Sequence, residues 1–318
     1  MEEGCDFRHW DELIPDALGL IFGNLALEEV LTVVPRVCRS WGGVVTGPYC
    51  WQEIDIEEWS RHETPEKIDR MLQMLITRSC GSLRKLCVSG LSDDSSLYSI
   101  AAHAKTLQTL RLPRCEISDP VVAQVAAMLS TITFLDVSYC LKIGAQALQA
   151  VGKHCRFLTG LRRVMNPLDV VDKPPQDDEA LAIAATMPKL KHLEIAHLLI
   201  STPCVIEILI NCRQLELLDV RGCWNVNLDE SHVKKYSAVK LLGPLVDYYA
   251  VNGWDTCSDY SGSSGYVAWD FADDDVEDFY DGLSDGFSDD EQAIEDVEMF
   301  FYDGLNAGDS GNGWPQSP

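Results

Sequence analysis

Aliphatic residues recur along residues 83–220 in a short repeated pattern, L-x-x-L-x-L or a near match to it. The first apolar residues of the copies are Leu83, Leu107, Ile132, Leu158, Leu190 and Leu215. They are 24, 25, 26, 32 and 25 positions apart, and the copy that starts at Leu158 is degraded. A fixed period of about 20–50 residues is typical of repeat architectures, in which each unit buries its apolar face against its neighbours.

The segments between the copies are predicted to be helices. Thr64-Pro65 and Asp119-Pro120 each place a helix-capping residue before a proline, and apolar residues at helical spacing follow both. Residues Ala180–Ala185 and Pro203–Ile210 occupy the same place in later copies. A strand followed by a helix at this period is typical of leucine-rich repeats. We therefore expect an α/β solenoid over residues 52–243, a curved parallel sheet with outer helices.

Two places depart from the repeat. The 32-residue step contains a predicted insertion, Asn166–Gln176, which includes three prolines. In the degraded copy, Arg163 stands where an apolar residue is expected, which indicates either a bulge or a functional gap. Trp51/Ile54/Ile56 resembles a partial first copy, so the segment before the repeats is expected to join them directly.

A second apolar pattern lies in residues 10–51. The i, i+3, i+4, i+7 spacing of one helical face is present at Leu18, Ile21, Phe22 and Leu25. Pro15 suits the first position of that helix, and Pro35 predicts a helix end at Val34 and a third short helix through Trp41. A segment of about 40 residues barely buries enough apolar surface to fold alone. This one is apolar on more than one face, so part of its surface is expected to need a partner. The alternative is an ordinary three-helix core without an interface.

The spacing of these blocks resembles an F-box. The resemblance is carried by Leu13-Ile14-Pro15, Leu18, Ile21-Phe22, Leu25, Val37-Cys38-Arg39-Ser40-Trp41 and Trp51. One departure is Ala26, where many members have Pro or Ser. Over residues 1–240 the chain is similar to plant F-box/leucine-rich-repeat proteins. That resemblance implies a three-helix F-box in residues 1–51 that docks on a Skp1-type adaptor, and through it on a cullin and a RING protein. It implies adaptor contacts among Leu13, Ile14, Pro15, Leu18, Ile21, Phe22, Leu25, Val37, Cys38, Trp41 and Trp51.

The non-leucine positions of each copy are expected to form a protein-binding surface. Side chains alternate along a strand, so these positions share the concave face of the sheet, and solenoids use such faces for recognition. Substrate contacts are expected among Lys85, Arg111, Phe134, Asp136, Arg162, His192, Glu194, Asp219 and Arg221. The surface is polar and mixed in sign, so a merely solvated face is the alternative.

The last part of the chain differs from the rest in its excess of acidic residues. Residues 241–318 contain 19 Asp and Glu and no Lys or Arg, whereas the rest holds 31 acidic and 25 basic residues. High charge with few aliphatics predicts a mostly disordered tail over residues 244–318. One helix near residues 288–301 is expected there, because Ser288 and Glu291 fit a capping box before an apolar stripe. Phe279-Tyr280-Asp281-Gly282-Leu283 recurs as Phe301-Tyr302-Asp303-Gly304-Leu305, which indicates either chance or a doubled docking motif.

The cysteines follow the repeat. Cys80, Cys155 and Cys212 lie three residues before a first apolar position, and Cys115, Cys140 and Cys223 lie three residues after the last one. This placement predicts small buried thiols. It favours them over a zinc site, since the chain has no C-x-x-C pair and its seven His are scattered.

Composition and motifs exclude several classes of function. There is no P-loop, G-x-S-x-G or H-E-x-x-H motif, and we expect no catalytic residue and no cofactor. The chain has no stripe of clustered Lys and Arg, so we do not expect it to bind nucleic acid directly. No apolar run is long enough to predict a membrane span. No secretory signal is visible either, which predicts a nuclear or cytoplasmic location.

Three functions are compatible with this reading. The first is the substrate-recognition subunit of an SCF-type E3 ubiquitin ligase, which binds a protein substrate through its repeats. The second is a non-catalytic scaffold whose F-box-like region only caps the solenoid. The third is a transcriptional adaptor that acts through the acidic tail. The sequence identifies neither the substrate nor any modification or small co-ligand that its recognition requires.

Overall fold

The structure is a computed structural model that describes residues 10–167, 174–229 and 234–244. The predicted acidic tail from residue 245 on, with its helix near residues 288–301, lies outside the described residues. So does the centre of the predicted insertion, residues 168–173.

Within the described residues, eight short strands form one parallel sheet in chain order. They are β1 (Glu53–Asp55), β2 (Lys85–Cys87), β3 (Thr109–Arg111), β4 (Phe134–Asp136), β5 (Gly160–Arg162), β6 (His192–Glu194), β7 (Leu217–Asp219) and β8 (Lys240–Leu242). The register aligns their middle residues in one row, from Ile54 in β1 to Leu241 in β8. The predicted solenoid is confirmed, and its partial first copy forms β1. The last strand, β8, belongs to no copy of the pattern and was not predicted.

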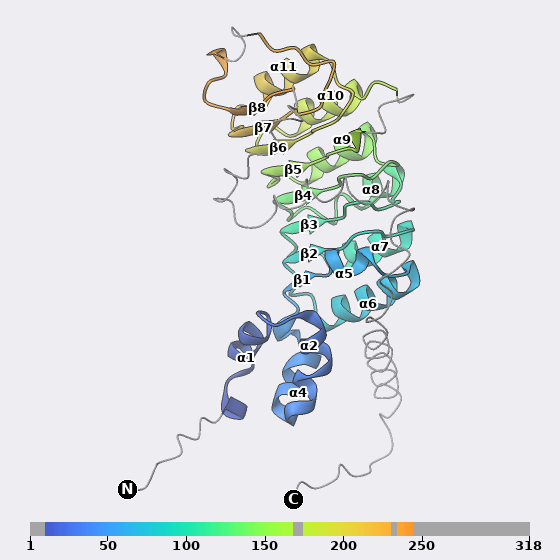
Figure 1. Cartoon of the computed structure of the whole chain (residues 1–318), viewed down its shortest axis with the longest axis vertical. Helices are drawn as coiled ribbons and strands as arrows, with labels where there is room; N and C mark the ends of the chain where they lie inside the picture. The colour runs from blue at the N-terminus through green and yellow to red at the C-terminus, as the bar shows by residue number, and fades with distance from the viewer. Residues whose placement is uncertain (1–9, 168–173, 230–233, 245–318) are drawn as a thin grey trace, which may run out of the picture.

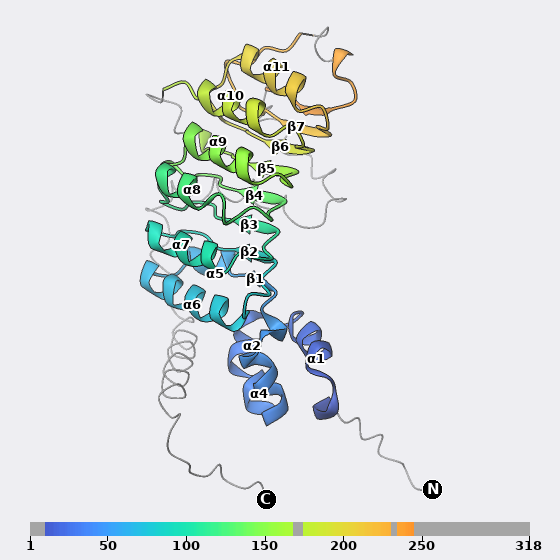
Figure 2. The ribbon, with the colours of Figure 1, turned by 180° about the vertical axis from the view of Figure 1, so that it is seen from behind.

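The helices of the solenoid lie on one side of the sheet, and the strands form the other side of an elongated stack (Figures 1 and 2). They are α5 (Glu57–Arg61), α6 (Pro65–Arg78), α7 (Asp94–Ala102), α8 (Asp119–Val125), α9 (Ala145–His154), α10 (Asp177–Thr186) and α11 (Thr202–Asn211). Thr64 is the N-cap of α6, which begins at Pro65 as predicted. The start of α8 is one residue earlier than predicted, because Ser118 is its N-cap and Asp119 its first residue. The two later predicted helices lie inside α10 and α11.

Aspartates in the first turns of α7 and α8 tie their repeats to the following ones. The carboxylate of Asp94 accepts the backbone N–H of Ser118 at 2.7 Å, just before α8. That of Asp119 accepts the N–H groups of Gly144 and Ala147 at the start of α9, at 2.7 and 2.9 Å. These N–H groups have no partner inside their own helix, so a carboxylate from the preceding repeat stabilises each helix start.

The N-terminal segment forms short helices at one end of the stack (Figure 1). They are η1 (Trp10–Glu12), α1 (Pro15–Phe22), α2 (Leu27–Thr32), α3 (Val34–Val37), α4 (Arg39–Thr46) and η2 (Pro48–Cys50). The prediction of one helix from Pro35 through Trp41 is wrong. Cys38 is extended, with φ −159° and ψ 168°, and separates α3 from α4. Gly42 allows α4 to pass close to α3, because a Cβ there would lie 3.3 Å from the Pro35 carbonyl oxygen.

One continuous apolar core runs from Leu18 in α1 to Val226 beyond β7. Trp51 links the two parts of the chain: it is buried, and its indole N–H donates to the Val45 carbonyl at 2.7 Å. Among the residues that the structure describes, no helix is both long enough and apolar enough to cross a membrane.

The repeat cysteines are buried, with one exception. Burial raises the pKa of the Cys140 and Cys212 thiols to about 11 and that of Cys155 to about 12. Their sulfur atoms lie against carbonyl oxygens of the preceding repeat, as Cys140 does with Leu112 at 3.0 Å. Cys80, predicted to be buried, is exposed. It lies in a turn with φ 49°, and Ser79 takes the small buried position instead.

Arg163 marks neither a bulge nor a gap. Its side chain is fully buried at the third apolar position of its repeat. The guanidinium pairs with Glu179 of α10 at 3.1 Å and donates to the carbonyls of Cys140 and Ile143 at 3.0 and 2.8 Å. A charged side chain therefore replaces an aliphatic one, and its nitrogens have partners in α10 and in the preceding repeat.

Candidate functional sites

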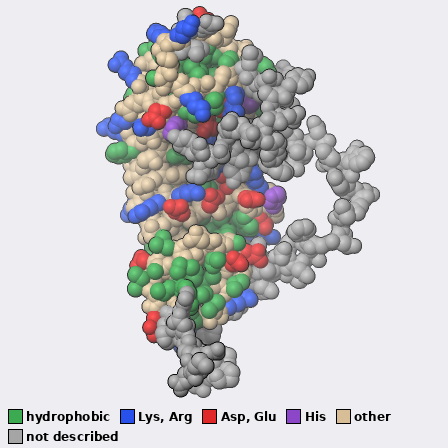
Figure 3. All heavy atoms as spheres, turned by 60° about the vertical axis from the view of Figure 1, so that its left-hand side comes forward, with side chains coloured by type: hydrophobic (Ala, Val, Ile, Leu, Met, Phe, Trp, Pro, Cys, Tyr) green, Lys and Arg blue, Asp and Glu red, His purple; other side chains and the backbone are tan. Residues whose placement is uncertain are grey.

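An apolar surface covers the N-terminal helices. Ile14, the N-cap residue of α1, is 66% exposed, and Leu20 within α1 is 76% exposed. Other large apolar side chains on these helices are also exposed: Trp10, Ile21, Leu25, Val33, Val37 and Tyr49. Figure 3 shows hydrophobic side chains gathered on this end of the molecule. Exposed apolar patches of this kind mark interaction sites more often than inert surface.

A separate layer of apolar side chains supports this surface from below. Leu18 and Phe22 point from α1 into the interior, and each is only 1% exposed. The ring of Phe22 packs against that of Trp41, with centroids 5.0 Å apart. Gly19 lets α1 approach η2, since a Cβ at Gly19 would lie 2.5 Å from the Tyr49 carbonyl oxygen. Leu18 and Phe22 are thus part of the continuous core, and the outer apolar residues lie outside it.

The predicted adaptor contacts divide between these two layers. Five are exposed: Ile14, Pro15, Ile21, Leu25 and Val37. Three are partly buried: Leu13, Cys38 and Trp41. Leu18, Phe22 and Trp51 are buried and belong to the apolar core. That any of the eleven residues contacts an adaptor stays a prediction. Leu20 and Val33 belong to the same exposed apolar surface, although the sequence analysis did not single them out.

The predicted substrate contacts lie in two rows on the sheet face opposite the helices. Lys85, Phe134 and His192 share the first register position of their strands. The third position carries Arg111, Asp136, Arg162, Glu194 and Asp219 in neighbouring strands. Arg221 follows β7 and pairs with Asp219 at 2.6 Å. The structure brings these side chains onto one face; that they contact a substrate stays a prediction.

Glu57, at the start of α5, continues this row into an alternating charge ladder, which we define as Glu57, Arg111, Asp136, Arg162 and Glu194. Arg111 pairs with Glu57 at 3.1 Å and with Asp136 at 3.4 Å. Arg162 pairs with Asp136 at 3.8 Å and with Glu194 at 2.9 Å. Burial raises the pKa of Glu57 and of Glu194, and the neighbouring arginines oppose this shift. The ladder is mostly buried, so its charges are held in fixed positions across the centre of the face.

Gly160 shapes the same face in a way that sequence analysis missed. A Cβ at this position would lie 2.5 Å from the ring of Phe134 on the adjacent strand. Glycine in β5 therefore allows the Phe134 ring to lie across the sheet, half-buried beside the charge ladder. The degraded copy that begins at Leu158 contains this glycine, and a glycine within a strand often marks such a close approach.

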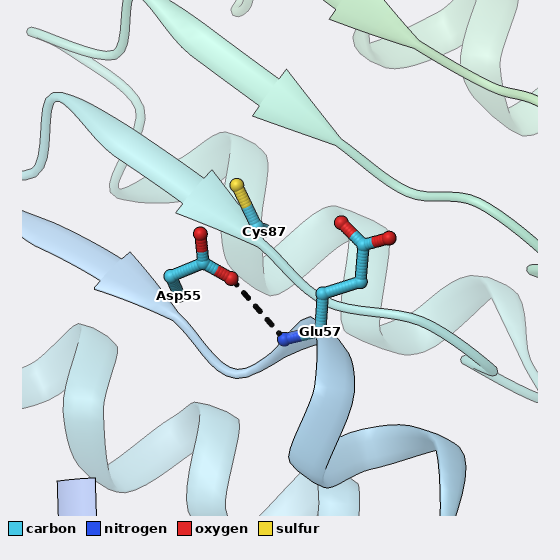
Figure 4. Close-up of side chains that lie close together, drawn as sticks. All are labelled: Asp55, Glu57 and Cys87. Atoms are coloured by element: carbon cyan, nitrogen blue, oxygen red, sulfur yellow. Dashed lines mark hydrogen bonds between the residues drawn. The ribbon is translucent and has the colours of Figure 1, made fainter. Parts of the chain in front are cut away.

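Asp55, Glu57 and Cys87 form the one cluster of potential metal ligands found among the described residues, with donor atoms within 4.8 Å of one another. Figure 4 shows the three side chains near the ends of β1 and β2. Asp55 pairs with Lys85 at 3.1 Å, and Glu57 pairs with Arg111. Burial raises the pKa of the Cys87 thiol to about 12, so it remains protonated at neutral pH. Each carboxylate has a cationic partner, and this chemistry favours ion pairs over a metal site.

Comparison with known proteins was made by sequence and by structure, and no family model matches the chain. The F-box protein FBW2 of Arabidopsis thaliana is 53% identical over 329 residues, which cover 100% of both chains. The chain belongs to the F-box protein family.

Two further F-box relatives from Arabidopsis thaliana are more distant. F-box protein SKIP19 is 33% identical, covering 76% of this chain and 78% of its own. Putative F-box/LRR-repeat protein 23 is 31% identical, covering 70% of this chain and 49% of its own. Among solved structures, a chain of the yeast Rad7 and Elc1 complex aligns with a TM-score of 0.43 at 20% identity, over 55% of this chain and 44% of that one. The predicted membership of the F-box/leucine-rich-repeat class is confirmed by the sequence relatives and by the observed fold.

Proposed function

We propose that this F-box protein is the substrate-recognition subunit of an SCF-type E3 ubiquitin ligase. In this proposal the N-terminal helices bind a Skp1-type adaptor, which links the chain to a cullin and a RING protein. The repeats bind a protein substrate, which is then ubiquitinated and degraded. The observation that carries the proposal is the layer of exposed apolar residues, Ile14 and Leu20 above all, over helices that already have a core.

The chain's part in the reaction is positioning. Holding a substrate lysine near a charged thioester raises the effective concentration of the two reactants and lowers the entropic part of the barrier. The rigid connection between F-box and repeats supports such a role, because Trp51 and β1 belong to the same apolar core as the repeats. The reacting groups would come from the other subunits and from the substrate.

The test is capture of a purified Skp1-type adaptor by the full chain. Replacing both Ile14 and Pro15 by Ala should abolish capture, since it removes exposed apolar surface at the start of α1. The matched control is Leu141→Ala, because Leu141 is equally exposed (66%) but follows β4 in the repeats. Both variants should keep the wild-type melting temperature, as none of the three residues belongs to the core.

Unchanged capture by the Ile14→Ala, Pro15→Ala variant would contradict the receptor role. The scaffold alternative would then be favoured, in which the helices only cap the solenoid. One observation suits that alternative: the helices pack directly on the first repeat through Trp51, as a cap would. The transcriptional alternative rests on the acidic tail, which lies outside the described residues.

A further inference from the structure

A pocket enriched in arginine lies on the sheet face at the carboxyl ends of β3, β4 and β5. Four arginines line it, Arg61, Arg111, Arg114 and Arg162, together with the two carboxylates of Glu57 and Asp136. The lining thus carries a net charge of +2 within a chain whose formal net charge is −25. Glu194, beside Arg162, reduces the local excess to +1, and Asp55 and Lys85 form a neutral pair nearby. A concave basic site on an acidic protein favours an anionic ligand.

The carboxylates of the pocket fix the arginines in place. Glu57 pairs with Arg61 at 3.3 Å as well as with Arg111, and Asp136 pairs with Arg111 and Arg162. Two acidic groups thus hold three guanidinium groups, which form a preorganised set of donors. Guanidinium groups held in this way can bind an incoming oxyanion with little further loss of side-chain freedom.

The rim of the pocket is both cationic and aromatic. Arg114 is exposed, and its guanidinium carbon lies 5.4 Å from the centre of the Tyr139 ring. Both residues have left-handed backbones, with φ 57° and 60°, in equivalent turns after β3 and β4. The N–H of Arg114 donates to the Ser138 carbonyl at 2.9 Å, which ties the two turns together. Pro113 and Val164 add apolar lining, so the recess suits a peptide side chain that carries an anionic end.

We propose that this pocket binds an acidic segment of a partner protein, with Asp or Glu carboxylates at Arg114 and Arg162 and an adjacent side chain against Pro113 and Val164. The inference rests on the proposed function, because the partner would be the substrate. Paired guanidinium groups recognise carboxylates by charge-assisted hydrogen bonds, and the Tyr139 ring restrains the orientation of Arg114.

The experiment measures fluorescence anisotropy of a labelled ten-residue peptide, with five Glu, one Val and four Gly, added to the full chain. We expect saturable binding that weakens as salt rises. The same peptide with Gln for Glu should bind at least about tenfold more weakly, as expected when charge-assisted hydrogen bonds are lost. Arg114→Gln should weaken binding by a similar factor, and Arg114→Lys by less, since it keeps the charge and loses the planar fork.

Arg156→Gln is the matched control. Arg156 is also an exposed arginine, but it precedes β5 and so lies at the opposite end of the strands from the pocket. The Arg156→Gln variant should bind the Glu peptide with the same affinity as the wild type. Equal affinity for the Glu and Gln peptides, or equal affinity of the Arg114→Gln and Arg156→Gln variants, would overturn the proposal.

The other occupants give different results. If only a phosphoserine version of the peptide binds, the pocket serves phosphorylated partners and the acidic-segment proposal is wrong. If no peptide binds while Arg114 is protected from phenylglyoxal in the full chain, the chain's own acidic residues occupy the pocket and the partner proposal is wrong.

Adaptor capture is a separate readout: Arg114→Gln should leave it unchanged. If the chain binds the peptide but captures no adaptor, the ligase role is wrong and the pocket proposal still holds.

Discussion

Arg163 and Glu179 form the most deeply buried ion pair of the repeats, and their energetics are asymmetric. Burying two charges costs solvation free energy, which the mutual attraction and the hydrogen bonds to Cys140 and Ile143 offset. Removing one partner leaves the other charge buried and uncompensated, which is far more costly than removing both.

We therefore expect Arg163→Leu to lower the free energy of unfolding by about 3–5 kcal/mol. The double variant Arg163→Leu, Glu179→Leu should recover most of this loss, because no charge remains unpaired. Urea denaturation of the two variants measures both quantities. A single variant as stable as the wild type would show that the pair contributes little and that the site adapts to an unpaired Glu179.

The thiols provide a second test at the level of residues. Cys140, Cys155 and Cys212 are buried and have raised pKa values. At neutral pH a thiol reagent therefore cannot reach their sulfur atoms, and the reactive thiolate form is scarce. Cys80 is exposed on its turn. A maleimide added to native protein should modify Cys80 within minutes and leave the other three unmodified, as read by peptide mass spectrometry. Rapid modification of those three without unfolding, or stoichiometric zinc, would contradict the repeat packing.

The helices of the solenoid depend on their neighbours for capping. Asp119 belongs to α8 but accepts two N–H groups at the start of α9, so it acts across a repeat boundary. Few of the helices are capped by their own side chains; α7 is one that is, through Asp93. The interface between repeats therefore includes specific hydrogen bonds as well as aliphatic contacts.

Asp119→Ala should lower the free energy of unfolding by about 0.5–2 kcal/mol, the usual range for loss of a helix cap. Asp119→Asn should cost less, because the amide oxygen still accepts from Gly144. Thermal unfolding of both variants, followed by circular dichroism, measures the difference. Equal destabilisation by Ala and Asn would mean that the carboxylate's charge matters and the hydrogen bonds do not.

The whole molecule is held by one core that includes the F-box helices and the repeats. Each repeat contacts mainly its neighbours, so stability passes along the stack from one interface to the next. The charged face, by contrast, is a property of the assembled stack, since each pair in the ladder joins residues from different repeats.

Truncation tests where this core ends. Pro244 is still tied to the last repeat, because its carbonyl accepts the N–H of Gly222 at 3.0 Å. Residues 245–318 carry 19 acidic residues and no basic ones, so by composition they contribute little to a packed core. A chain that ends at Pro244 should keep the wild-type melting temperature and adaptor capture. A drop of more than a few degrees would show that the acidic segment caps the solenoid.

The solenoid and the F-box could be predicted from the sequence, because both arise from local patterns. A repeat of L-x-x-L-x-L directs one face of every strand into the core, whatever the rest of the chain does. The concave positions could be predicted for the same reason, since alternation along a strand assigns each residue to a face. The F-box could be recognised because its apolar blocks have a definite spacing.

Where two neighbouring residues could each take a buried position, long-range packing determines which of them is buried. Ser79 is buried and Cys80 exposed because the end of α6 sets the turn, and Leu18 is core while Leu20 is surface because η2 and α4 cover one side of α1. The partner of Arg163 lies 16 residues away in α10, and the arginine pocket collects residues from four elements. Local periodicity specifies a face, whereas burial and pairing depend on what packs against that face from distant parts of the chain.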